Sequence, residues 1–152
     1  MLMLLFQLGN SRYAVPAREV VEIASMVELE PLPKTPDYIA GLFNYRGQHV
    51  PVLDLRQLVS NHPCSNRITT RMILVDFPLA AGGTRTLALL AEHVTETLQL
   101  DEQEFTDTGI NIPDAPFIGK AAYTDQGLVQ KLSITDLVPP DVQSQLYPAE
   151  AG

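Results

Sequence analysis

Three histidines and one cysteine are the side chains of this sequence that could hold a metal or attack a substrate. His49, His62 and His93 lie 13 and 31 residues apart, and no compact set of metal ligands has this spacing. Cys64 follows His62 in a polar loop, with no third group to orient the two side chains for thiol catalysis. The spacing therefore predicts no metal site and no catalytic residue, and we expect Cys64 to be a free loop cysteine.

Other signals for enzyme chemistry are equally weak. Gly41 and Gly47 do not form a phosphate-binding loop, because Gln48 stands where such a loop requires lysine. The acidic stretch Asp101–Asp107 has the composition of a solvated linker rather than of an acid/base pair. With a net charge of −8, the chain has no excess of basic side chains that could neutralise the phosphates of a nucleic acid. We therefore expect no cofactor, no nucleic-acid partner and no enzymatic activity.

The stretch GLFNYRGQHVPVLDL, residues 41–55, points instead to binding. It places Arg46 at a turn between two segments with strand-like apolar patterns. Gly47 is expected to supply a left-handed backbone position in this turn, and Asp54 is expected to cap a helical turn that begins near Leu55. Arg46 is then either a solvated turn cation, as most surface charges are, or a binding residue.

Short strands are the main elements that must position these residues. The apolar run 2–8 is too short for a membrane span and lacks the flanks of a signal peptide, so we expect a strand that forms a hairpin with residues 12–15. An i, i+3, i+4, i+7 pattern predicts a short amphipathic helix at Ala17–Ala24. Prolines predict a stiff connector at Glu30–Asp37. Further strands are predicted at 41–45, 50–55, 72–77 and 86–91. A helical turn is predicted after Leu55, and Val94–Leu100 is predicted to be a helical turn followed by an extended stretch.

An internal repeat organises the chain. Residues 38–59 align without gaps on residues 117–138 at a shift of 79, and the apolar positions coincide. Two such modules predict two small barrels that share one core, although strands of a sandwich would give the same local patterns. Tyr123–Gln126 carries no arginine at the position of Arg46. The scaffold therefore does not require Arg46.

Three stretches together resemble the CheW family of chemotaxis coupling proteins. They are LLFQLGNSRYAVPAREVVEI, PLPKTPDYIAGLFNYRGQHVPVLDL and a degenerate second copy that ends in ITDL. The most specific element is N-x-R-G-x-x-V-P-V-x-D-L, from Asn44 to Leu55. The segment LFNYRG, residues 42–47, most resembles the corresponding segment in coupling proteins of Wsp-type surface-sensing systems. The type-IV-pilus chemosensory branch is the alternative.

The resemblance implies a mainly β, CheW-like fold of two packed five-stranded SH3-like β-barrels with short helices. The whole chain, 1–152, is then one CheW-like domain. Its two pseudo-repeated barrel subdomains are expected at about 15–65 and 66–138, with the N-terminal strand available to join the second, and a C-terminal tail at 139–152.

The resemblance also implies a function. The chain would be a non-enzymatic adaptor that couples the cytoplasmic tips of chemoreceptors, the methyl-accepting proteins, to the regulatory domain of a CheA-type histidine kinase. It would be cytoplasmic, associated with receptor arrays at the inner membrane, without inserting into the membrane itself. The partner-binding residues that carry over are Arg46, Glu22, Val20, Ile23, Asn44 and Gly47.

Each of these residues also has a purely structural interpretation. Val20 and Ile23 could be core residues, and Glu22 could be an exposed charge of little energetic value. Two other functions remain open. A stand-alone CheW-like domain would compete for one partner only, and a small-molecule enzyme would use the groove between the barrels, with a polar pocket converging on His93 or His49.

Overall fold

The computed structural model describes residues 1–148, and its secondary structure is mostly β, as predicted. Short apolar and β-branched runs separated by turn residues favour strands over long helices. The strands are β1 (Leu2–Leu8), β2 (Ser11–Pro16), β3 (Val20–Ser25), β4 (Ile39–Tyr45), β5 (Gln48–Asp54), β6 (Arg71–Pro78), β7 (Thr84–Gln99), β8 (Thr106–Asp107), β9 (Ile118–Thr124) and β10 (Gly127–Leu132). The helices are α1 (Leu55–Ser60) and α2 (Pro140–Leu146), with 3-10 turns at Ala17–Glu19, Glu102–Glu104 and Ile134–Asp136.

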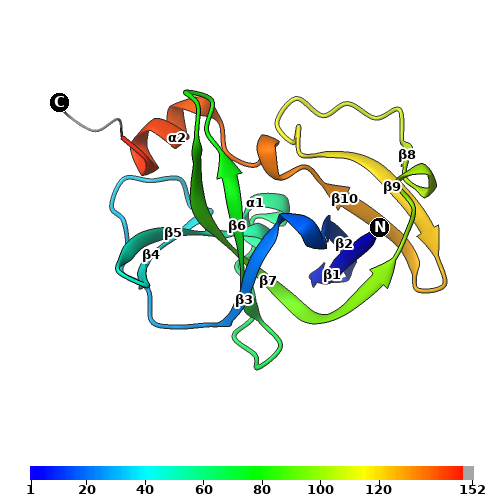
Figure 1. Ribbon diagram of the computed structural model, residues 1–152, viewed down its shortest axis with the longest axis horizontal. Helices are drawn as coiled ribbons and strands as arrows, with labels where there is room; N and C mark the ends of the chain where they lie inside the picture. The colour runs from blue at the N-terminus through cyan, green and yellow to red at the C-terminus, as the bar shows by residue number, and fades with distance from the viewer. Residues whose placement is uncertain (149–152) are drawn as a thin grey trace.

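The strands form two groups that meet along β7 (Figure 1). In the first group, here called the first sheet, the order is β3-β6-β7-β5-β4. In the second sheet the order is β7-β1-β2-β10-β9-β8. An isolated bridge between Glu30 and Leu42 brings the segment after β3 onto β4. The two edges of the first sheet therefore approach each other, which curls the sheet around its inner face.

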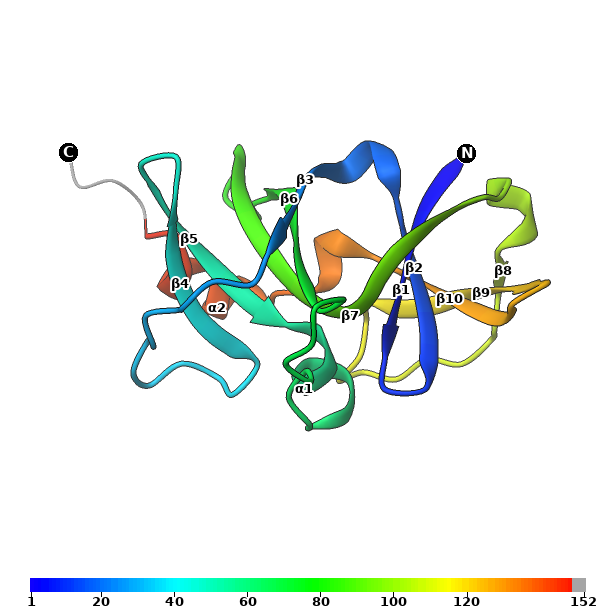
Figure 2. The same cartoon turned by 90° about the horizontal axis from the view of Figure 1, so that it is seen from below.

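The long strand β7 passes from one sheet to the other (Figure 2). Its first half pairs with β6 along Thr84–Ala91, and its second half pairs with β1 up to Gln99. The register against β1 shifts beyond Glu92, and His93 at this point has a φ of 49°. A β-bulge of this kind bends a strand and changes its direction, so the crossing between the sheets lies at His93.

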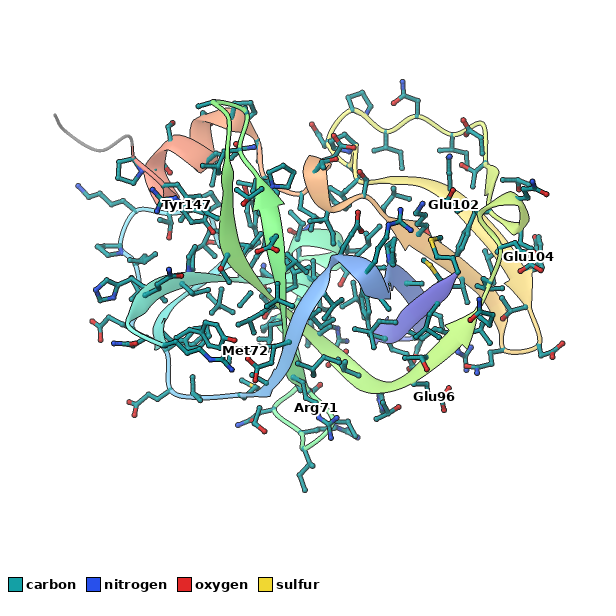
Figure 3. The ribbon with its side chains drawn as sticks, in the orientation of Figure 1. Arg71, Met72, Glu96, Glu102, Glu104 and Tyr147 are labelled. Carbon is teal, nitrogen blue, oxygen red and sulfur yellow. The ribbon has the colours of Figure 1, made fainter. Side chains whose placement is uncertain are left out.

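Three clusters of buried side chains make up the core. One fills the inner face of the first sheet and includes Val52, Met72 and Leu90. Figure 3 shows Met72 among the strands of this sheet. A second cluster, with Met3 and Val129, fills the inner face of the second sheet. The largest cluster lies between the sheets and draws on both.

Strand periodicity explains how one strand serves two clusters. In β7, Leu87 and Leu89 face the shared cluster, whereas Ala88 and Leu90 face the inside of the first sheet. Successive side chains of a strand point to opposite faces, and here both faces are covered. This is why these strands read as continuous apolar runs rather than as an alternating pattern.

Two predicted helical segments are strands. The predicted helix at Ala17–Ala24 is a 3-10 turn followed by β3, which pairs with β6. At Val94–Leu100 the predicted extended stretch is confirmed, but the predicted helical turn before it is also strand, because the second half of β7 pairs with β1 up to Gln99. Both segments are rich in β-branched residues, and in short runs the periodicity alone does not separate helix from strand. Both segments form strands because each pairs with another strand, β6 in the first case and β1 in the second.

The repeated segments are the same structure twice. The bounds of β4, Ile39–Tyr45, shifted by 79 give those of β9, Ile118–Thr124, and each strand forms a hairpin with the next one. The division into subdomains at about 15–65 and 66–138 stays a prediction. The strand β6 (Arg71–Pro78) lies beyond the predicted boundary at residue 66, yet it pairs with β3 and so belongs to the first sheet.

Both helices are tied to the strands. The carboxylate of Asp54 accepts the backbone N–H of Gln57 at 3.1 Å, which confirms the predicted cap of α1. The predicted C-terminal tail includes α2, where Val142 is buried and the side-chain oxygen of Gln143 accepts the backbone N–H of Ala80 at 2.8 Å. The end of this segment lies near the β6–β7 hairpin, where Tyr147 donates to the carbonyl of Thr86 (Figure 3). Residues 149–152 of the predicted tail lie outside the described residues.

Candidate functional site

The turn that carries Arg46 is a tight two-residue hairpin. Arg46 and Gly47 both have positive φ, 51° and 85°, as in the type I′ turns whose twist matches antiparallel strands. The left-handed position predicted for Gly47 is confirmed. The side-chain oxygen of Asn44 accepts the backbone N–H of Gly47 at 2.9 Å, so Asn44 stabilises the turn. Arg46 takes up a conformation that non-glycine residues rarely adopt, and its side chain is 76% exposed.

Glu22 and Arg46 contact each other, and both contact Tyr45. The distance between Nη2 of Arg46 and Oε2 of Glu22 is 3.4 Å. The hydroxyl of Tyr45 donates to the same carboxylate oxygen, and the guanidinium carbon of Arg46 lies 5.1 Å from the centroid of the Tyr45 ring. We call Glu22, Asn44, Tyr45, Arg46 and Gly47 the Arg46 cluster. It joins the tip of the β4–β5 hairpin to β3.

Hydrogen bonding to Glu22 is the main cause of an altered titration in this cluster. It raises the pKa of the Tyr45 hydroxyl above its usual range, with burial adding to the effect and the charge of Arg46 opposing it. The phenol therefore stays protonated at neutral pH and remains a donor. Tyr45 therefore contributes a hydrogen-bond donor, rather than an acid or a base, to the cluster.

Val20 and Ile23 lie on the other face of β3. Ile23 pairs with Ile73, a residue of the shared cluster, whereas Glu22 pairs with Leu74, which faces the inside of the first sheet. Ile23 is 40% exposed, and Val20 is partly buried against the shared cluster. The predicted site residues therefore form two groups, one on each face of this strand.

The edge of β3 is where the two groups meet. Among residues 1–148, β3 pairs with β6 alone. The register shifts between Val20 and Glu22, which leaves Val21 51% exposed beside Ile23. A partner that lies along this edge can reach apolar side chains on one side and the Arg46 cluster on the other.

The residues considered for enzyme chemistry are dispersed. No group of three or more His, Cys, Asp or Glu side chains comes close enough to hold a metal within the described part of the chain. His93 lines a hollow of about 210 Å³ and His49 lines a different one of about 330 Å³, so the two histidines do not converge on one pocket.

Cys64 is free and partly buried. Burial, and then the nearby carboxylate of Asp54, raise the pKa of its thiol far above the ordinary value. The nucleophilic form of a cysteine is the thiolate, so this thiol is poorly suited to attack a substrate. Its backbone N–H donates to Asp54 at 3.0 Å, which gives the residue a structural role in the loop after α1.

A family model named CheW-like domain matches residues 2–140, nearly the whole of the described chain. The chain belongs to the CheW-like domain family. The relatives that match by sequence include chemotaxis protein CheW of Klebsiella aerogenes, 31% identical over 101 residues, which cover 66% of this chain and 58% of that protein. Protein FrzA of Myxococcus xanthus is 42% identical over 55 residues, which cover 36% of this chain and 34% of that protein. The chain thus spans about a third to three fifths of these relatives.

A solved structure shares the fold. The scaffolding protein TtCheW from Thermoanaerobacter tengcongensis superimposes with a TM-score of 0.78 over 91% of this chain and 89% of its own, at 24% sequence identity. The CheW-like fold predicted from the sequence is therefore confirmed. None of the helices within residues 1–148 is long and apolar enough to cross a bilayer.

Two residues at the candidate site of this CheW-like domain are not predicted from the sequence. Tyr45 contacts both Glu22 and Arg46, and Val21 is the most exposed apolar side chain of β3. An aromatic residue directly before an arginine in a strand-turn pattern could have signalled a ring under a guanidinium. The exposure of Val21 depends on a bulge in β3, and a segment interpreted as a helix gives no sign of one.

Proposed function

We propose that this CheW-like domain is a non-enzymatic adaptor that couples the cytoplasmic tips of chemoreceptors to the regulatory domain of a CheA-type histidine kinase. Support comes from the family, from relatives named chemotaxis proteins and from a structural relative named a scaffolding protein. The observation that carries the proposal is the Arg46 cluster, a charged group that borders an apolar strand edge.

The receptor side of this proposal is physically consistent. Receptor tips are helical hairpins, and a helix binds an apolar surface through residues spaced three or four apart. Val21 and Ile23 on β3 offer exposed apolar contacts, and Arg46 retains N–H groups beyond its single contact with Glu22. A charged residue at the rim of such a contact fixes the orientation of the helix.

Coupling requires a second surface for the kinase. One face holds the receptor and another holds the kinase, so that both partners are tethered at high effective concentration. A rearrangement of the receptor can then shift the balance between kinase conformations without any reaction in the adaptor. We propose a cytoplasmic location at receptor arrays of the inner membrane as part of the same function.

The test is a pull-down with the full chain, a receptor cytoplasmic fragment and the kinase. We expect the wild type to retain both partners together. Arg46→Glu should weaken receptor binding more than about tenfold, because a repelling charge replaces a donor at the contact, and it should keep the kinase. Arg67→Glu makes the same charge change at an exposed loop residue outside the Arg46 cluster and should retain both partners.

Other outcomes identify the alternatives. Retention of only one partner by the folded wild type would favour the stand-alone domain that competes for a single partner. Retention of neither would overturn coupling. The finer assignment to a Wsp-type surface-sensing system is proposed on the wording LFNYRG, and selective binding of a surface-sensing receptor over a type-IV-pilus receptor would support it.

A further inference from the structure

Tyr45 stands between the core of the first sheet and the exposed charges of the Arg46 cluster. Its ring packs against the inner cluster of the first sheet, and the centroid of the Phe43 ring lies 6.2 Å away at an interplanar angle of 59°. A ring held from below in this way has few alternative rotamers. The position of Tyr45 is therefore set by the fold.

Both charged residues of the cluster are held by this one side chain. The hydroxyl of Tyr45 donates to Oε2 of Glu22, and the ring lies under the guanidinium of Arg46. The contact between Arg46 and Glu22 is long, at 3.4 Å, and exposed. An exposed ion pair alone does not fix two long side chains, so the ordering has to come from the aromatic ring and its hydroxyl.

The internal repeat supplies a natural comparison. Thr124 and Asp125 occupy the positions of Tyr45 and Arg46 in the β9–β10 hairpin, and Tyr123 occupies that of Asn44. Tyr123 is 89% exposed. The hairpin scaffold therefore forms with no aromatic residue at the position of Tyr45, which indicates a role for Tyr45 beyond forming the hairpin.

We propose that Tyr45 is a positioning residue that holds Arg46 and Glu22 in one preformed arrangement for a receptor helix. The inference rests on the proposed function. The arrangement fits a helix that places an acidic side chain opposite the free N–H groups of Arg46, beside apolar residues that contact β3. Ordering the arginine before binding reduces the entropy lost when the helix docks.

The test compares three tyrosine variants by affinity for a receptor cytoplasmic fragment. Tyr45→Phe keeps the ring and removes the donor to Glu22, and we expect the Kd to rise about threefold to fivefold. Tyr45→Leu removes the ring as well, and the Kd should rise about tenfold or more. Tyr123→Phe, the control in the repeated hairpin, should leave the Kd unchanged. Kinase binding should stay the same in all three variants. The Tm should stay the same in Tyr45→Phe and Tyr123→Phe, whereas Tyr45→Leu should lower it, because the ring contacts with the inner cluster of the first sheet are lost.

A double-mutant cycle separates positioning from a general structural effect. If Tyr45 acts through Glu22, Tyr45→Phe should add nothing in a Glu22→Ala background. An equal loss in both backgrounds, or wild-type affinity in Tyr45→Leu, would overturn the proposal.

A measurement without receptor keeps the inference distinct from the proposed function. The heteronuclear NOE of the Arg46 Nε–H group reports side-chain order in the free protein, and it should fall in Tyr45→Leu but not in Tyr123→Phe. A wild type that binds no receptor fragment overturns the proposed function. An unchanged NOE in Tyr45→Leu overturns the positioning role, whatever the binding result.

Discussion

At the scale of single residues, Glu92 is a buried carboxylate that several partners hold in place. It is 5% exposed and accepts backbone N–H groups from Gly9 at 2.9 Å and Ser65 at 2.6 Å. Nη1 of Arg56 lies 3.0 Å from the same side chain. A buried charge is tolerated only where such partners replace water. Glu92 thereby ties the β1–β2 turn, α1 and the loop after α1 to β7.

These partners determine how Glu92 titrates. Burial by itself would raise the pKa of the carboxyl, but the N–H groups of Ser65 and Gly9 and the charge of Arg56 hold it below the ordinary value. A carboxyl with a lowered pKa in the folded state stabilises the protein above its unfolded pKa. That contribution is lost as the pH falls through the folded pKa.

Removing this charge should therefore destabilise the fold in a pH-dependent way. We expect Glu92→Gln to lower the free energy of unfolding at pH 7 by about 2 to 3 kcal/mol, because the partly buried Arg56 loses its counter-charge. The difference from the wild type should shrink in acid, below the usual titration range of a glutamate. Urea denaturation of both proteins at pH 7 and in the acidic range measures it.

A matched control is available on the surface. The carboxylate of Glu102 lies 3.5 Å from Arg18, and both side chains are about 60% exposed. Glu102 belongs to the 3-10 turn that follows β7 and lies on the side of the second sheet (Figure 3). Glu102→Gln should change the free energy of unfolding by less than about 0.5 kcal/mol. Equal effects of the two substitutions would show that burial of Glu92 is not the cause.

Sequence reasoning reached part of the site at this scale. The resemblance to the CheW family implies Arg46, Glu22, Asn44 and Gly47 as binding residues, and the structure brings these four together. Tyr45 was missed because its contact with Glu22 joins residues 23 positions apart. That contact exists only because β3 is a strand, and the sequence pattern had favoured a helix there.

At the scale of elements, two segments approach each other so closely at Gly41 that the backbone there leaves no room for a side chain. Leu42 and Glu30 exchange backbone hydrogen bonds of 2.9 Å in each direction. Gly41 has a φ of 148°, and a Cβ at this position would lie 2.5 Å from the carbonyl oxygen of Glu30. Only glycine allows the connector after β3 to pack onto β4 in this way.

Gly41→Ala should weaken the fold by separating these segments. We expect the free energy of unfolding to fall by at least about 2 kcal/mol, because backbone atoms cannot move aside as a flexible side chain can. Chemical denaturation measures the loss. Gly119→Ala in β9 is the control, since a Cβ there meets nothing within 4 Å and no positive φ is required. A neutral Gly41→Ala would contradict the close approach.

The hairpins were the elements most accessible to prediction. Turn residues between apolar runs correctly indicated the hairpins β1–β2 and β4–β5, and the repeat correctly aligned β9 with β4. The errors were the helix predicted at β3 and the helical turn predicted from Val94 in β7. Both segments pair with strands distant in the sequence, and no local pattern encodes such a partner.

At the scale of the whole molecule, the two sheets share one core rather than touching at a surface. The shared cluster takes Leu4 and Phe6 from β1, Ile73 from β6 and Leu89 from β7. Neither sheet can bury these side chains without the other. The repeat predicts this shared core. The predicted boundary near residue 66 groups β6 with the second subdomain, whereas β6 pairs with β3 and β7 in the first sheet, and β6 has no counterpart within the aligned segments that could have indicated this.

The shared core predicts one cooperative unfolding transition for both sheets. Leu89→Ala should destabilise the protein by about 3 kcal/mol, since Leu89 is fully buried. Hydrogen exchange should then accelerate by a similar factor in the amides of β3, from the first sheet, and of β10, from the second. Faster exchange in only one sheet would show that the sheets unfold separately, and would support independent subdomains.

The position of β7 in the chain also has a consequence for synthesis. β1, β5 and β6 each pair with β7, which ends at Gln99. On the ribosome, β7 must emerge as far as Ala91 before β5 and β6 have their full set of neighbours, and as far as Gln99 before β1 has them. Until then the apolar side chains of β1 and β6 lack partners, so we expect the nascent chain to be prone to aggregation until residue 99 leaves the exit tunnel.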